Sequence, residues 1–306
     1  MAEDRFIDDA INRSAETAED RVKLASMVAE AATGAPAAPT GGDGPSDASI
    51  LNFALNLEYL EAEFYLRGAT GRGLPDDLVG GTGKPGQVSG GRQVNFASPV
   101  IKNIAHEIAM DERAHVAFLR GALGDAAVAR PRISLGYSFT AAATAAELIK
   151  PGEIFDPYAS DRNFLFAAFL FEDVGVTAFK GAAPFISNKT YLDAAAGLLA
   201  TEAYHAGIVR ATLFAEGLAD DSVFDVLHKI SAVRNAVSGP ADDDQDLGTK
   251  DEANLVPTDE HGRAFGRSAA EILNIVYLDP QGASSGGFYP DGLNGDIVQG
   301  AAPTAG

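Results

Sequence analysis

Two short motifs in this sequence place a glutamate three residues ahead of a histidine, as Glu112-x-x-His115 and Glu202-x-x-His205. Residues i and i+3 of an α-helix lie on nearly the same face, so each motif presents a carboxylate and an imidazole side by side. Together these groups are suitable ligands for iron, manganese or zinc. The chain has no cysteine, which excludes disulfides, thiolate metal sites and cysteine nucleophiles.

Two further glutamates, Glu58 and Glu172, share with the motifs a setting among apolar residues at helical spacing. The apolar residues on the faces of these four glutamates are Leu51, Leu55, Ala62, Ile101, Ala105, Ile108, Leu119, Leu165, Ala168, Phe169, Val176, Phe179, Ala195, Leu198, Leu199, Ala206 and Val209. A buried ionised carboxylate is costly unless it is paired or binds a metal. Four of them therefore favour two divalent cations over a plain core.

The number and order of these residues match a known type of two-metal site. Carboxylate-bridged sites in helical bundles take one Glu from each of two helices and a Glu-x-x-His from each of the other two. The predicted ligands are Glu58, Glu112, His115, Glu172, Glu202 and His205. The predicted cofactors are two transition-metal ions, iron or manganese. Two other interpretations fit the same pattern: a coincidental set of polar core residues, and a degenerate site that no longer binds metal.

Apolar spacing and capping residues predict an all-α fold. The predicted long helices run over about 46–67, 98–123, 160–181 and 188–216, a fifth over 220–237, and short ones over 140–149 and 268–277. Two helices, a long crossover and two more helices are the connectivity of a ferritin-like four-helix bundle, although other bundles fit the pattern too. The predicted divisions are an N-terminal arm and linker (1–45, with a helix over 4–32), the bundle (46–237) and a loop-rich C-terminal extension (238–306).

The net charge of −20 and the pI of about 4.5 disfavour binding to nucleic acids and anionic lipid surfaces. No stretch is long and apolar enough to predict a transmembrane helix, and the first 33 residues do not read as a signal peptide. The acidic run 242–246 is expected to be a solvated loop. A homodimer packed through bundle faces is the expected assembly.

Three stretches carry a specific family resemblance. Residues 55–65 (LNLEYLEAEFY), 111–115 (DERAH) and 171–179 (FEDVGVTAF), with tail segments 254–259 and 287–292, resemble the ferritin-like domain of desiccation-related proteins. The resemblance covers about 46–295 and implies the same bundle fold. Bacterial members often carry a twin-arginine export signal, but residues 20–24 here read DRVKL. Cytoplasmic localisation is therefore favoured, and periplasmic localisation is the alternative that the resemblance implies.

Two functions are consistent with these residues. The first is an oxidoreductase that acts on dioxygen or peroxide, as a ferroxidase, peroxidase or catalase-like enzyme. In it Tyr65 would support a ligand and Glu61 would shuttle protons. For a tyrosine in a core, packing is the more common role, and a surface position for Glu61 is equally consistent with the sequence. The second is a non-enzymatic metal-binding or desiccation-protection protein. Glu63, His106 and His228 are expected to lie outside the site, with Glu63 solvated.

Overall fold

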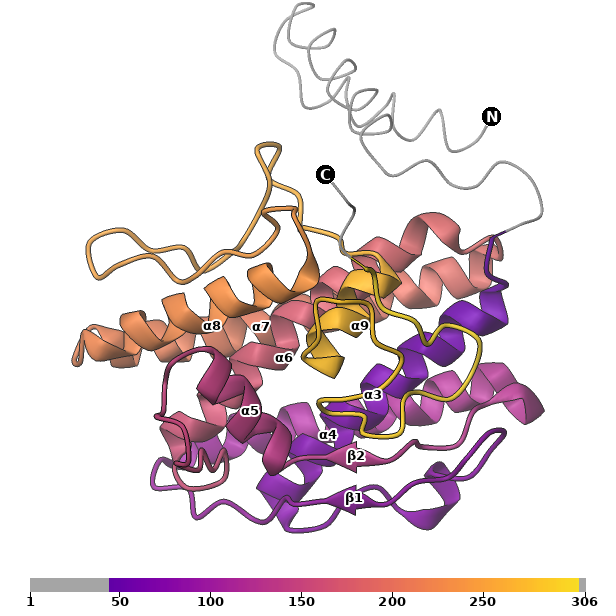
Figure 1. Ribbon diagram of the computed structural model, residues 1–306, viewed down its shortest axis with the longest axis horizontal. Helices are drawn as coiled ribbons and strands as arrows, with labels where there is room; N and C mark the ends of the chain where they lie inside the picture. Colours follow the sequence, from indigo (N-terminus) through magenta and orange to yellow (C-terminus); the bar gives the residue numbers. More distant parts are fainter. Residues whose placement is uncertain (1–43, 303–306) are drawn as a thin grey trace, which may run out of the picture. The chain divides into compact units, whose positions relative to one another are not determined.

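The computed structural model describes residues 44–302, so the predicted helix over 4–32 lies outside the described residues. Residues 45–302 lie in one compact unit. Its framework is the predicted set of four long helices: α3 (Asp47–Thr70), α4 (Pro99–Leu123), α6 (Asp161–Ala182) and α7 (Lys189–Gly217) (Figure 1). Helix α3 packs along α4, and α6 packs along α7. Within residues 44–302, no helix has the length and hydrophobicity needed to cross a bilayer.

Capping residues explain where the long helices begin. The side chains of Ser46, Ser98, Ser160 and Asn188 each accept hydrogen bonds from backbone N–H groups in the first turn that follows. These donors have no partner inside their own helix, so the caps stabilise each start. Helix α3 ends at Gly71, whose φ of +78° is in the left-handed region that glycine adopts without strain.

Smaller elements connect and flank the bundle. They are α5 (Tyr137–Ala145), α8 (Ser222–Ser238), α9 (Ala269–Tyr277), the 3₁₀ turns η1 (Asp76–Leu78), η2 (Gly124–Ala126) and η3 (Ala183–Phe185), and the strands β1 (Val88–Ser89) and β2 (Ile133–Ser134). Helix α5 replaces the helix predicted over 140–149; it ends earlier because Glu147 has a φ of +54°. The parallel β1–β2 pair ties the loop after α3 to the crossover, and two-residue strands are too short to show alternation in the sequence.

The C-terminal extension covers α3, as the yellow trace in Figure 1 shows. The Tyr289 hydroxyl donates to the Asn56 carbonyl at 2.7 Å, and the Asn56 amide donates to the Asn294 carbonyl at 2.8 Å. Helix α9 packs on α6 and α8. As a result α3 is buried almost all round, whereas α4 and α7 each keep an exposed face.

The expectation of a solvated Glu63 is wrong. Its side chain is fully buried and accepts hydrogen bonds from Arg67, at 2.8 Å, and from Arg130. Arg67 is one helical turn away, but Arg130 comes from the crossover, which covers this side of α3. Helical periodicity relates residues of one helix, so it could not predict the contact between Glu63 and Arg130.

A network of three buried arginines holds the extension against the bundle. Arg210 of α7 donates to Asp173 and to backbone carbonyls of residues 245, 246 and 254. Arg234 of α8 donates to Asp173 and Asp244, at 2.8 and 2.7 Å, and Arg267 donates to Asp244 at 2.9 Å. Asp244 belongs to the acidic run that the sequence predicts to be solvated, so for this residue the prediction is wrong.

Replacing Asp244 with Ala is expected to lower the free energy of unfolding by about 3–5 kcal/mol, because two buried guanidinium groups lose their shared partner. Chemical denaturation measures the change. Asp242→Ala is the matched control: Asp242 is exposed and makes one 3.3 Å contact with Asn235, so its effect should stay within about 0.5 kcal/mol. Equal effects of the two substitutions would show that the network does not stabilise the fold.

Candidate metal centre

Each of the four long helices contributes one of the predicted ligand glutamates to the centre of the bundle. The predicted residues come together there: Glu58 from α3, Glu112 and His115 from α4, Glu172 from α6, and Glu202 and His205 from α7. The four glutamates are at most 1 % exposed. None points to bulk solvent, as expected for carboxylates on the apolar faces of their helices.

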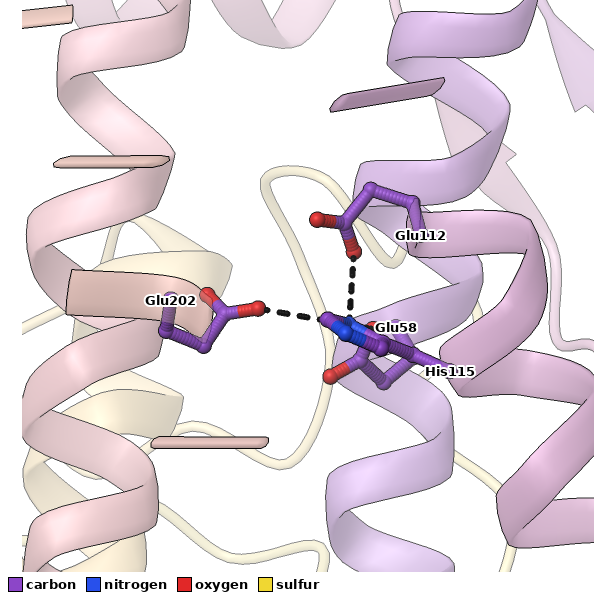
Figure 2. A group of neighbouring side chains, drawn as sticks. All are labelled: Glu58, Glu112, His115 and Glu202. Atoms are coloured by element: carbon purple, nitrogen blue, oxygen red, sulfur yellow. Dashed lines mark hydrogen bonds and ion pairs between the residues drawn. The ribbon is translucent and has the colours of Figure 1, made fainter. Parts of the chain in front are cut away.

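The six residues form two overlapping groups, each with ligand atoms within 4.8 Å of one another. In the first, Nδ1 of His115 lies 3.2 Å from Glu58, 3.5 Å from Glu202 and 3.6 Å from Glu112 (Figure 2). The second consists of Glu112, Glu172 and His205.

In the second group, Nδ1 of His205 lies 3.0 Å from Glu112 and 3.6 Å from Glu172. Glu112 belongs to both groups, so its carboxylate is shared between them. The two histidine rings stack with their centroids 6.1 Å apart.

Burial makes the charged form of these carboxyl groups unfavourable unless a positive charge lies nearby. It raises the pKa of Glu58, Glu172 and Glu202 above the usual range, and the neighbouring carboxylates add to the effect. Burial acts on Glu112 too, but its close contacts with the two imidazoles outweigh it and lower the pKa of Glu112 to about 2.

The two imidazoles respond in the opposite direction. Burial disfavours their charged forms, but the surrounding carboxylates raise the pKa of His205 to about 10 and that of His115 still further. Without a metal, imidazolium ions are thus the only counter-charges that the six residues supply.

Hydrogen bonding in the cluster fits a metal better than a polar core. Within residues 44–302, neither carboxylate oxygen of Glu112, Glu172 or Glu202 has a hydrogen-bond partner of normal geometry. Buried polar atoms are nearly always satisfied, and divalent cations satisfy carboxylate oxygens without donor hydrogens. The donor set of four carboxylates and two imidazoles suits iron, manganese or zinc.

Glu61 and Tyr65, both on α3, lie beside the two groups. Glu61 is 5 % exposed, so the surface position that the sequence left open is excluded. Burial raises the pKa of its carboxyl group, and the charge of Glu202 raises it further. The buried Tyr65 hydroxyl interacts with Glu172.

Two residues near the cluster were missed by the sequence analysis. Asp111, half-exposed, lies 3.2 Å from Nε2 of His205 and can hold the ring so that Nδ1 faces the cluster. Its position directly before Glu112 is the feature of the sequence that could have identified it. Gly175 of α6 lies against the Glu202 carboxylate and near Glu61. By contrast, His106 and His228 are exposed, and His228 pairs with Asp246 instead.

Replacing Gly175 with Ala is expected to displace Glu202, because the new Cβ would fall well inside van der Waals distance of its carboxylate. We expect metal affinity to fall by about 10–100-fold, the range for losing a group that orients a ligand. Equilibrium dialysis measures it.

The matched control for Gly175→Ala is Gly197→Ala on α7, where a new Cβ would meet no described atom within 4 Å apart from its chain neighbours and the nearby backbone of its own helix. That control should bind metal normally and be more stable by up to about 1 kcal/mol, the difference in helix propensity. Normal metal affinity in Gly175→Ala would mean that Glu202 is not a ligand.

A surface pocket of about 310 Å³ opens between α4 and α7 and is lined by Ile104, Glu107, Ile108, Asp111, Thr201, Tyr204, His205 and Ile208. His205 is the residue in this lining that also belongs to the buried cluster. The opposite side of the bundle, along α3, is covered by the C-terminal extension. The pocket is therefore the approach to the cluster that these observations support.

Comparison with known proteins is consistent with this geometry. Residues 46–215 match the family model described as a ferritin-like domain. A desiccation-related protein of Craterostigma plantagineum is 32 % identical over 267 residues, which cover 82 % of this chain and 83 % of that protein. A ferritin-like catalase of Nesocodon mauritianus is 29 % identical over 277 residues, covering 85 % and 87 %. No solved structure gives a significant match.

Proposed function

Since this chain belongs to the ferritin-like domain family, we propose that it holds two iron or manganese ions and acts as an oxidoreductase that disproportionates hydrogen peroxide. The observation that carries the proposal is the buried cluster of four glutamates and two histidines with unsatisfied carboxylate oxygens. The relative that is named a ferritin-like catalase supports peroxide, among the candidate substrates, as the one to test first.

The proposed ligands divide between two ions. Glu58, His115 and Glu202 would hold one, Glu172 and His205 the other, and Glu112 would bridge them. When bound, a redox-active pair of ions supplies the electron exchange by which two molecules of hydrogen peroxide become two of water and one of dioxygen. The packed apolar core around the ligands keeps bulk water from them.

Disproportionation also moves protons between oxygen atoms, and Glu61 is the group we assign to that task. It is a buried carboxyl group beside the ligands but in neither metal-binding group. A carboxyl with a raised pKa can hold a proton near neutral pH and return it. The Tyr65 hydroxyl, beside Glu172, would orient that ligand by a hydrogen bond.

The pocket between α4 and α7 would admit the substrate. Hydrogen peroxide is small and uncharged, so Glu107 and Asp111 at the mouth do not repel it. The His205 ring lines both the pocket and the cluster.

The second candidate is a non-enzymatic metal-binding protein that protects cells during drying. It is favoured by the relative named desiccation-related, at 32 % identity. In this case the cluster would bind metal, or would have lost the ability to bind it, without turning over peroxide.

Association into a homodimer is compatible with either function, and sedimentation measurements test it.

Metal analysis and dioxygen release distinguish the two candidates. Protein purified from its native host should contain about two iron or manganese ions per chain, as the ligand set requires, and should release one dioxygen for every two peroxides consumed. Metal-loaded protein without dioxygen release would support the second candidate. Protein that binds neither metal under any loading condition would contradict the proposed site.

A further inference from the structure

Two small apolar cavities follow one another along helix α6, on the side that packs against α9. The outer cavity, of about 40 Å³, lies between α5, α6, α8 and α9. Val233, Val237 and Leu278 line it and are partly exposed, so it reaches the surface. Arg234 is the polar side chain of this lining, and two aspartates pair with its charge. The outer cavity is therefore apolar in character.

The inner cavity, of about 20 Å³, lies between α3, α6 and α9. Leu170 of α6 and Ile275 of α9 line both cavities, so the two cavities meet at these side chains. Glu61 and Gly175 also line the inner cavity. A Cβ built at Gly175 would contact the Glu202 carboxylate and would lie 3.4 Å from Oε1 of Glu61. The inner cavity therefore extends to the immediate neighbourhood of a proposed metal ligand.

The linings determine which molecules these cavities accept. A cavity needs about 10–15 Å³ to hold one molecule the size of water, so the inner cavity holds about one and the outer cavity about two or three. Glu61 is the polar side chain of the inner lining, whereas a buried water usually has two to four polar partners. Apolar cavities stay dry and take up apolar guests such as xenon. Dioxygen is apolar and close to water in size, so its transfer from water into these cavities is favourable.

We propose that the two cavities form a path along which dioxygen, a small apolar gas, moves between the surface and the metal-site cluster. The path passes Leu170 and Ile275, and it opens when these side chains change rotamer. Dioxygen is a product of peroxide disproportionation, so the path is its exit, while the more polar pocket between α4 and α7 admits peroxide. The use as an exit rests on the proposed function, whereas occupation by the gas does not.

NMR spectroscopy of the metal-free full chain under dioxygen tests the occupation. Dioxygen is paramagnetic and broadens the signals of methyl groups that lie close to it. We expect greater broadening for Leu60 and Val174, which line the inner cavity, than for Leu55 and Val209, which are at least as buried and line neither cavity. Equal broadening of the two pairs would overturn the proposal.

Variants of Leu170 test the order of the path. Leu170→Phe narrows the point where the cavities meet, so Leu60 should lose its excess broadening, while Ile230, in the outer cavity, should keep its own. Leu170→Ala widens this point and should increase the broadening of Leu60. The matched control is Leu199→Phe, at a half-buried position of α7 outside both linings, which should change neither signal. Unchanged broadening of Leu60 in a folded Leu170→Phe or Leu170→Ala protein would overturn the path.

Turnover of the metal-loaded protein tests the use as an exit. Leu170→Phe should lower kcat and leave kcat/KM for peroxide unchanged, because product leaves after the chemical step and peroxide enters on the other side. An unchanged kcat in a variant that has lost the broadening of Leu60 would overturn the exit. Wild-type protein that takes up dioxygen at Leu60 but does not turn over peroxide would contradict the proposed function and support the gas path. Turnover without excess broadening would overturn the path alone.

Discussion

Replacing Glu112 with Gln is expected to remove both metal ions and to abolish peroxide turnover while the helical fold survives. Glu112 is the residue that belongs to both ligand groups, and an amide cannot bridge two cations as a carboxylate does. Loss of a group that merely orients a ligand costs about 10–100-fold in affinity or activity, so loss of the bridge should lower kcat/KM by more than about 100-fold. Metal analysis and dioxygen release measure the two effects.

The controls for this prediction come from the same helix. Glu107→Gln makes the same chemical change at an exposed position of α4 and should keep both ions and normal turnover. His115→Ala removes a ligand from the first group alone and should retain about one ion per chain, since the second group of Glu112, Glu172 and His205 is complete without it. A Glu112→Gln protein that still holds two ions would refute the bridging assignment.

Removing the metal is expected to make stability fall as the pH rises. Glu58, Glu61 and Glu172 have folded-state pKa values raised by burial, so above about pH 4.5 the folded protein holds more protons than the unfolded chain. His205, with a pKa of about 10 against 6.5 for a free imidazole, extends this excess toward pH 10. Stability falls with pH wherever the folded state binds more protons.

The effect of Glu112 on the pH dependence of stability has the opposite sign and is confined to acidic pH. Its pKa of about 2 means that the stability it contributes is present above pH 4.5 and is lost as the pH falls toward 2. The metal-free protein should therefore be most stable in mild acid and should unfold at lower temperature with each step toward alkaline pH.

Adding metal should reverse this trend. Divalent cations replace the protons of the cluster, so binding strengthens as the pH rises and releases protons to the buffer. A ligand at 1,000 times its dissociation constant stabilises a protein by about 4 kcal/mol per site, so the gap in unfolding temperature between loaded and chelated protein should widen with pH. Calorimetry in buffers of different ionisation enthalpy counts the protons. A gap that is absent at every pH would identify a degenerate site.

Helical periodicity was sufficient to predict the residues of the cluster, because each proposed ligand lies on the apolar face of its own helix. Glu112 and His115 are one turn apart, and the apolar residues around them indicate which side of α4 faces the core. The caps at Ser46, Ser98 and Ser160 mark where the helices begin. These relations are local, so they can be read directly from the sequence.

Where the burial and the partners of a side chain depend on distant segments of the chain, they could not be predicted in this way. Glu63 was expected on the surface because it lies on the far side of α3 from Glu58, but Arg130, 67 residues later, binds it there. Glu61 is buried because the helix it belongs to is covered on more than one side. Asp244 reads as part of a soluble acidic run, and only packing of the extension against α8 brings it to Arg234.

The sequence by itself determined the type, spacing and helical face of the metal-site residues, and hence the kind of fold that could gather them. The tertiary structure alone decided that Glu112 lies in both ligand groups, that Asp111 contacts His205, and that the C-terminal extension closes one side of the bundle. The physical reason is that helix geometry relates residues three or four positions apart. Contacts between segments tens of residues apart depend on how whole surfaces pack.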